Sequence, residues 1–175
     1  MAFFNPKTIQ GVTYTLDHLD PFEFALDTGD KTRRVAVRFR CHCFTEKLAA
    51  HHTPDFQYVH AGETRAFDFG RHGLSKLLPT IIRTLGTRSV YRSQARNYYI
   101  LRQNPTTGFN GPYLIFFNVI KAHRNNLDVI MNVESAYMKP GMTDRASPIR
   151  FATLIEKTAL NQPVPQTPWQ TIKRK

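Results

Sequence analysis

The clearest period-two pattern lies in residues 33–44, RRVAVRFRCHCF. Alternate positions are apolar: Val35, Val37, Phe39, Cys41 and Cys43. The positions between them carry cations or an imidazole: Arg34, Arg38, Arg40 and His42. Because successive side chains of a strand point to opposite faces, this alternation predicts a half-buried strand with a cationic solvent face.

A helical period follows in residues 74–86. Apolar residues recur three and four positions apart: Leu74, Leu77, Leu78, Ile81, Ile82 and Leu85. This spacing predicts an amphipathic helix, with Ser75 as its cap, Gly86 at its end and Pro79 in its first turn or at a kink. A second amphipathic helix is expected at about 149–160, where the stripe is Phe151, Leu154, Ile155 and Ala159.

The remaining apolar segments read as strands. Loose alternation covers 12–26, Phe67 and Phe69 indicate a short strand, and 89–102 forms another. Residues 113–121 and 127–137 flank a short polar turn and predict an antiparallel hairpin. We therefore expect an α+β fold, a twisted antiparallel sheet with two main helices packed on one face. The other face, or one end of the sheet, would then be basic and open.

One domain is expected over 1–160, with an acidic segment at 1–30 and a Pro-rich basic tail at 161–175. The net charge is +11 and the pI is about 10.0. The first 30 residues carry a balance of −4, and no carboxylate occurs between Asp68 and Asp128. Such a surface attracts polyanions, and the acidic segment could screen it.

Composition also excludes several classes of protein. No apolar run approaches the roughly 20 residues that span a bilayer, so no membrane partner is expected. The N-terminus MAFFNPKTIQ lacks a secretory signal pattern, and the two cysteines are too close for a good disulfide, which favours a cytoplasmic location.

Metal chemistry finds little support in the sequence. Carboxylates are too scattered to predict a magnesium nuclease site. Five possible zinc ligands lie within twelve residues: Cys41, His42, Cys43, His51 and His52. Since tetrahedral sites favour two to four residues between cysteines, we expect buried thiols and no cofactor.

Metal-free RNA cleavage remains as a candidate chemistry. It needs a base for the 2′-hydroxyl, an acid for the leaving oxygen and cations for the transition state. The candidates are His72, Tyr137 and Lys139 for proton transfer and charge stabilisation, with Arg71 and Ser135 positioning the phosphate. A helix-flanking role for His72 and a buried position for Tyr137, continuing the apolar face of Val129, Met131 and Val133, are the structural alternatives.

Nucleic-acid binding has its own candidate set, drawn from cations and from a tyrosine near them. Its members are Arg34, Arg38, Arg40, His42, Arg92, Arg96, Tyr98, Arg145 and Arg150. Arginine binds phosphate in a bidentate manner and tyrosine stacks on unpaired bases.

Three segments carry a resemblance: RFRCHCFTEKL, FDFGRHGLSKLLPTIIRTL and NVESAYMKP. They are similar to a group of bacterial, often mobile-element, proteins labelled "stationary phase growth adaptation protein" or "heat shock protein C", over residues 33–160. The order of elements resembles more loosely the RelE- and barnase-like ribonuclease toxins. That resemblance of architecture implies RNA cleavage without metal.

We therefore expect a protein that interacts with nucleic acid, RNA rather than DNA, as a metal-independent, toxin-like endoribonuclease. A non-enzymatic RNA- or DNA-binding module of plasmid or phage biology is the alternative. A third interpretation is an adaptor for an acidic protein partner, such as an antitoxin.

Overall fold

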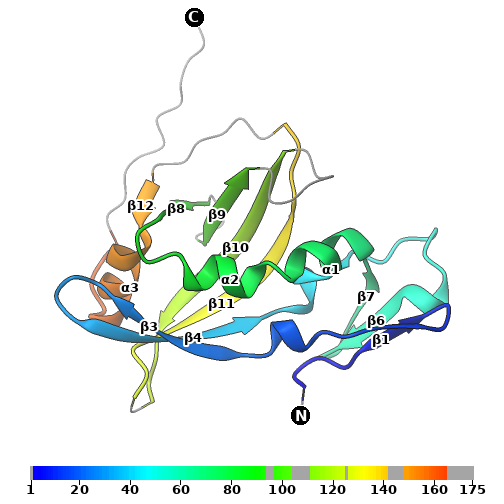
Figure 1. Ribbon diagram of the computed structural model, residues 1–175, viewed down its shortest axis with the longest axis horizontal. Coiled ribbons are helices and arrows are strands. Elements are labelled where there is room, and N and C mark those ends of the chain that lie inside the picture. Colours follow the sequence, from blue (N-terminus) through cyan, green and yellow to red (C-terminus); the bar gives the residue numbers. More distant parts are fainter. Residues whose placement is uncertain (1, 94–96, 104–110, 125, 142–147, 165–175) are drawn as a thin grey trace, which may run out of the picture.

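The computed structural model describes residues 2–93, 97–103, 111–124, 126–141 and 148–164, with side chains at 101–103 left out. A seven-stranded sheet forms its centre, in the order β12-β8-β9-β10-β11-β4-β3 (Figure 1). Its strands are β3 (Phe22–Asp27), β4 (Thr32–Phe39), β8 (Ser89–Arg92), β9 (Tyr98–Gln103), β10 (Pro112–Lys121), β11 (Val129–Met138) and β12 (Pro148–Arg150).

The fold is α+β, as predicted, but its large sheet is mixed rather than wholly antiparallel. β10 and β11 form the predicted antiparallel hairpin, whereas β11 pairs with β4 in parallel, from Val129 opposite Val35 to Val133 opposite Phe39. The parallel pair arises because the chain leaves the large sheet after β4 and returns to it through β8, β9 and β10 before it forms β11.

Two smaller sheets accompany the large one. β1 (Lys7–Ile9) pairs with β2 (Val12–Tyr14). β5 (Thr45–Glu46), β7 (Glu63–Phe67) and β6 (Gln57–His60) form a three-stranded sheet in that order. Short 3-10 turns η1 (Asp17–Leu19), η2 (Cys41–Cys43) and η3 (Pro54–Phe56) connect these strands.

The helices pack on one face of the large sheet, where Figure 1 shows α1 (Phe69–Ser75) and α2 (Leu78–Arg83) lying across the strands. α3 (Phe151–Ala159) contacts β10, β11 and β4. The predicted apolar stripes are buried here, with Leu74, Leu78, Ile82 and Leu154 at most 2% exposed. They join Val35, Val37, Ile115 and Val129 in one main core.

The first helix begins earlier than predicted and is interrupted. Asp68, not Ser75, is its cap, because the Asp68 carboxylate accepts a hydrogen bond from Arg71 N at 2.6 Å. Ser75 instead ends α1, buried, with its hydroxyl donating to the His72 carbonyl oxygen. Pro79 lies in the first turn of α2, where a missing amide hydrogen costs no helical bond.

The predicted strand at 33–44 ends at Phe39. The chain then turns at η2, where the amides of Cys43 and Phe44 donate to the carbonyl oxygens of Arg40 and Cys41. The alternation of apolar and polar residues continues past the strand because Cys41 and Cys43 are both buried within the turn. The sequence pattern therefore predicted a longer strand than the structure has.

Arg33 makes the most enclosed ion pairs of the described residues. Its Nη1 lies 2.9 Å from Asp128 Oδ1 and its Nη2 lies 2.7 Å from Glu156 Oε1, with the Arg33 side chain 9% exposed. These bonds join β4, the start of β11 and α3. Arg33 therefore stands on the core face of β4, and its neighbour Arg34 faces the other way.

The acidic N-terminal segment is part of the fold, since β3 is an edge strand paired with β4. Asp20 accepts a hydrogen bond from Phe3 N at 2.7 Å, and Glu23 pairs with Arg34 at 2.6 Å. Over the described ranges, no helix is both long and apolar enough to cross a membrane.

Removal of the Arg33 guanidinium should destabilise the protein strongly. Arg33→Met leaves Asp128 and Glu156 without their cation in a poorly hydrated site, a change that costs about 3 kcal/mol in typical proteins. Urea unfolding measures the loss. Arg34→Met is the matched control, because its pair with Glu23 is exposed and should contribute less than about 1 kcal/mol. Equal losses for both variants would contradict the role given to Arg33.

The same site predicts a pH dependence. Hydrogen bonds from Arg33 and Thr28 lower the pKa of Glu156 from 4.5 to about 2. A carboxyl with a depressed folded pKa stabilises the fold above its unfolded pKa and loses that contribution as pH falls through the folded value. The free-energy difference between wild type and Arg33→Met should therefore shrink between about pH 4.5 and pH 2. Urea titrations across that range test this, and a constant difference would refute it.

Candidate nucleic-acid interface

The face of β4 and β8–β11 turned away from the main core is the candidate interface, and we call it the outer face. Alternation along β4 places Val35 and Val37 in the core and Arg38 on the outer face. Arg40 follows the end of the strand, and both arginines are exposed. No helical residue of the described ranges belongs to the apolar cluster on this face.

Arg38 and Arg40 differ from Arg34 in their partners. Arg34 on the same face is neutralised by Glu23 at 2.6 Å. Within the described part of the chain, no carboxylate lies within ion-pair distance of Arg38 or Arg40. Two guanidinium groups are therefore available for an anionic ligand.

A bulge in the β10–β11 hairpin decides which residues of β11 face outward. Phe116 pairs with Ser135, but the next residue, Phe117, pairs with Val133. Glu134 is thus an extra residue, and the alternation changes phase there. Ala136 takes the core position, and Tyr137 faces outward instead of continuing the buried side of β11 as the sequence indicated.

An aromatic row crosses the outer face over four strands. Tyr91 stacks on Tyr99 with ring centroids 5.3 Å apart, Tyr99 contacts Phe116 at 5.8 Å, and Phe116 stacks on Tyr137 at 5.5 Å. Tyr99 is buried, together with Leu114. Tyr91, Phe116 and Tyr137 are only half-buried, so they retain part of their ring surface for a ligand.

Beside the row lies a chain of amides that ends on a carboxylate. Asn132 Nδ2 donates to Asn118 Oδ1 at 2.9 Å, and Asn118 Nδ2 donates to Glu134 Oε1 at 2.8 Å. Asn97 Nδ2 donates to Glu134 Oε2 at 2.8 Å. These bonds fix the polar groups beside the rings, where donors and acceptors can read the edges of unpaired bases.

Two of the five predicted catalytic residues meet. The Arg71 guanidinium carbon lies 5.1 Å from the centroid of the Tyr137 ring. Arg71 Nη1 also donates to the Thr45 and His42 carbonyl oxygens, at 2.8 and 3.3 Å. These backbone contacts fix the guanidinium beside the outer end of the aromatic row.

His72 lies elsewhere, inside an aromatic pocket at the N-terminal segment. Its Nε2 is 3.0 Å from the Thr15 carbonyl oxygen, and its ring contacts those of Tyr14, His18 and Phe67. Burial lowers its pKa. A 6% exposed imidazole that is bonded to backbone supports packing rather than proton transfer to an external substrate.

The other two catalytic candidates flank Tyr137 along β11. Ser135 is half-buried at the bulge, opposite Phe116. Lys139 is exposed just beyond the strand, and its backbone amide donates to Pro112 O at 3.0 Å. Both are therefore within two residues of Tyr137 along the chain, whereas His72 is in a separate pocket beside Tyr14 and Thr15.

Several predicted binding residues lie away from the outer face. Tyr98 is 9% exposed in the main core, where burial raises its pKa, and Arg92 pairs with it in the β8–β9 register. Arg150 belongs to β12, at the edge of the sheet opposite β3. His42 is bonded to Glu63 at 2.9 Å. Arg96 and Arg145 lie outside the described residues.

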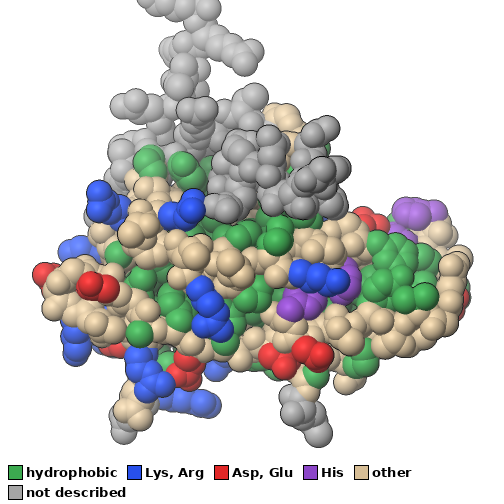
Figure 2. Space-filling model, viewed as in Figure 1, with side chains coloured by type: hydrophobic (Ala, Val, Ile, Leu, Met, Phe, Trp, Pro, Cys, Tyr) green, Lys and Arg blue, Asp and Glu red, His purple; other side chains and the backbone are tan. Residues whose placement is uncertain are grey.

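The helix-bearing face has a different charge pattern. Figure 2 shows that its Lys and Arg side chains are spread among other residues, with acidic side chains at several positions. The coloured residues of this view form no single basic patch. The described part of this face therefore offers no concentrated basic surface for a polyanion.

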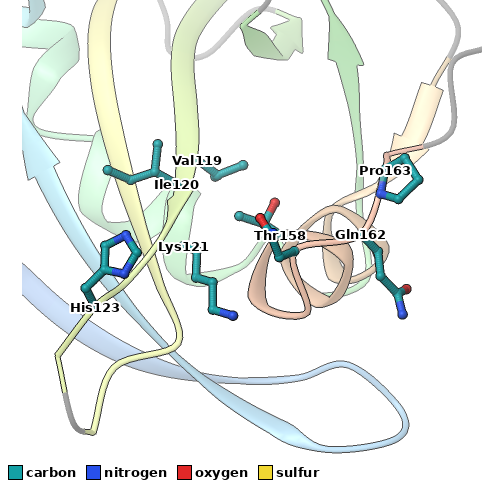
Figure 3. Close-up of a pocket in the computed structure, with 8 residues that line it drawn as sticks. Val119, Ile120, Lys121, His123, Thr158, Gln162 and Pro163 are labelled. Carbon is teal, nitrogen blue, oxygen red and sulfur yellow. The ribbon is translucent and has the colours of Figure 1, made fainter.

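An open hollow lies between the end of β10 and α3 (Figure 3). Lys121, His123, Thr158 and Gln162 contribute polar groups to its wall. Gln162 is held by Lys157, whose Nζ donates to Gln162 Oε1 at 2.8 Å. The described lining provides one permanent cation, Lys121, which suits a small anion better than an extended polyanion.

Sequence reasoning did not select the amide chain or Phe116. A signal was present, since Asn118 and Asn132 are polar residues inside two otherwise apolar strands. Polar residues at such positions usually have hydrogen-bonded partners, and these two are partners of each other.

Comparison with protein families gives a match over most of the chain. The model of the YjaZ family matches residues 6–159, which include all three segments that carried the sequence resemblance. No curated protein and no solved structure matches the chain, so the likeness to ribonuclease toxins has no counterpart among these comparisons. Because the match covers residues 6–159 of the 175, well over half of the sequence, the chain belongs to the YjaZ family.

Proposed function

We propose that this protein binds single-stranded nucleic acid, RNA in preference to DNA, on the outer face of its large sheet. The observation that carries the proposal is the placement of Arg38 and Arg40. Both are exposed on or beside that face without a carboxylate partner in the described ranges, and Arg38 lies opposite Asn132 of the amide chain in the β4–β11 register.

Each group on this face has a complementary group in an unpaired strand. Arginine binds phosphate through parallel N–H bonds. The half-buried rings of Tyr91, Phe116 and Tyr137 can stack on bases, an interaction worth about 1–3 kcal/mol per base. Amide and carboxylate oxygens accept hydrogen bonds from base edges and from the ribose 2′-hydroxyl, which favours RNA.

The face suits a single strand better than a duplex. Double-stranded RNA hides its bases and is read by shape across the minor groove, and double-stranded DNA is read by an element that enters a groove. A sheet surface with rings and amides instead needs bases that are already unstacked. The overall charge of +11 adds a non-specific attraction that speeds encounter.

Arg38→Gln/Arg40→Gln should weaken RNA binding and its salt dependence. Two lost phosphate contacts to a single strand reduce the slope of log K against log salt by roughly 1.4. Fluorescence anisotropy with a labelled, unstructured RNA at several salt concentrations measures both quantities. Lys76→Gln/Arg88→Gln is the matched control, because it removes two exposed cations from the helix-bearing side and should leave most of the affinity.

Equal losses in both double variants would show that charge alone acts, and absence of binding by wild type would reject the proposal. Tyr137→Leu separates stacking from charge: it should cost about 1–3 kcal/mol of affinity with the salt slope unchanged. If RNA affinity falls when cations are removed but is unchanged in Tyr137→Leu, the protein behaves as expected for an adaptor of an acidic protein or antitoxin.

A second candidate is metal-independent, toxin-like RNA cleavage at the end of the aromatic row. The Arg71–Tyr137 contact of 5.1 Å favours it, since a guanidinium beside a phenol can stabilise charge on a phosphate while the phenol transfers a proton. Ser135 and Lys139 would position the phosphate and add charge. The buried His72 has no part in this version.

Cleavage predicts that the protein cuts labelled RNA in EDTA and that Tyr137→Phe abolishes cutting while retaining binding. The ring remains in Tyr137→Phe, so stacking is preserved and only the hydroxyl is lost. Gel analysis of RNA length is the measurement. His72→Gln serves as the control and should cut as wild type does. RNA that is bound but stays intact would leave binding as the whole function.

A further inference from the structure

A thiol, an imidazole and a carboxylate converge beside η2. Cys41, His42 and Glu63 each offer one ligand atom, and these atoms lie within 4.8 Å of one another. His42 Nε2 is 2.9 Å from both Glu63 carboxylate oxygens. Cys41 is buried, His42 is half-buried and Glu63 is exposed, so the cluster lies at the boundary between core and solvent.

The turn at η2 is what brings Cys41 and His42 together. On a strand, neighbouring side chains would point to opposite faces and could not share a ligand. The 3-10 turn replaces the strand at Cys41–Cys43, and both side chains then approach Glu63, at the start of β7. The two residues thereby act as neighbours in space as well as in sequence.

A second layer of hydrogen bonds supports Glu63 and the backbone of Cys41. Arg65 Nη1 donates to Glu63 Oε1 at 3.1 Å, and Arg65 Nε donates to Thr45 Oγ1 at 2.8 Å. Thr45 in turn donates to the Cys41 carbonyl oxygen at 2.7 Å. Second-layer bonds of this kind orient metal ligands and improve affinity.

We propose that Cys41, His42 and Glu63 form a zinc-binding site with a fourth position for water. Zinc accepts sulfur, nitrogen and oxygen ligands in tetrahedral geometry, and a thiolate with an imidazole disfavours magnesium and calcium. The ion replaces the hydrogen bond between His42 and Glu63: the His42 proton moves from Nε2 to Nδ1, which leaves Nε2 as the ligand atom, and the Cys41 thiol releases its proton to solvent. Thiolate and carboxylate then balance the charge of the ion.

Another group of possible ligands fits a metal less well. Glu46, His51 and His52 also come within 4.8 Å, with His52 Nε2 at 2.9 Å from Glu46 Oε1. However, Ala49 N donates to His52 Nδ1, so the neutral ring carries its proton on Nε2, the atom that faces Glu46. A metal there would have to displace that proton or break the backbone bond.

Cobalt substitution tests the zinc site without reference to nucleic-acid binding. The EDTA-treated protein is titrated with Co²⁺ and followed by absorption. We expect one equivalent to produce a thiolate-to-cobalt charge-transfer band and the d–d bands of tetrahedral cobalt, and Zn²⁺ to remove both. The charge-transfer band requires sulfur, so the cluster of Glu46, His51 and His52 cannot produce it.

Variants assign the ligands. Cys41→Ser should lose the charge-transfer band, and Glu63→Gln should bind Co²⁺ at least 10-fold more weakly, in line with losses at metal-site residues. Glu63 is exposed, so Glu63→Gln tests the site without disturbing the core. The matched control is Cys43→Ser, whose wild-type thiol is fully buried and lies 3.9 Å from Val133 O.

Three results would overturn the proposal. These are a wild-type protein with no charge-transfer band, a band that survives in Cys41→Ser, and an affinity unchanged in Glu63→Gln. Circular dichroism spectra matching wild type show that each variant is folded, so that loss of the band reports loss of a ligand. Retention of the band in Cys43→Ser completes the expected pattern.

Discussion

The β10–β11 bulge is the constraint on which the outer face depends. Without the extra residue at Glu134, alternation would carry Tyr137 to the core side and Ala136 outward. The phase change places Tyr137 beside Phe116 and so extends the aromatic row to β11, where the Arg71 guanidinium lies over the Tyr137 ring. One inserted residue thus determines which chemistry the sheet presents to solvent.

Carboxylates explain how a basic chain can fold without self-repulsion dominating. Arg33 forms ion pairs with Glu156 and Asp128, and Arg34 forms one with Glu23. Glu63 is paired with Arg65 and His42. Asp68 and Asp20 accept backbone hydrogen bonds instead. Because these carboxylates already bind groups of the protein itself, Arg38 and Arg40 have no carboxylate partner among the described residues and are available to an external anion.

Periodicity predicted the fold class, the hairpin and the buried stripes, because those features depend on local alternation. It could not predict the η2 turn, since Cys41 and Cys43 remain buried whether the chain is extended or turned. Nor could it place Tyr137 or His72. The position of Tyr137 depends on a bulge, and that of His72 on the distant residues Tyr14 and Thr15.

Arg71 touches both proposed sites, since it lies over the Tyr137 ring and donates to the His42 carbonyl oxygen. A shift of the His42 backbone on one side is therefore transmitted to the guanidinium beside the aromatic row. If both ligands bind, thermodynamic reciprocity follows: whatever factor the metal applies to RNA affinity, RNA applies to metal affinity. A single side chain would then make this protein responsive to metal supply.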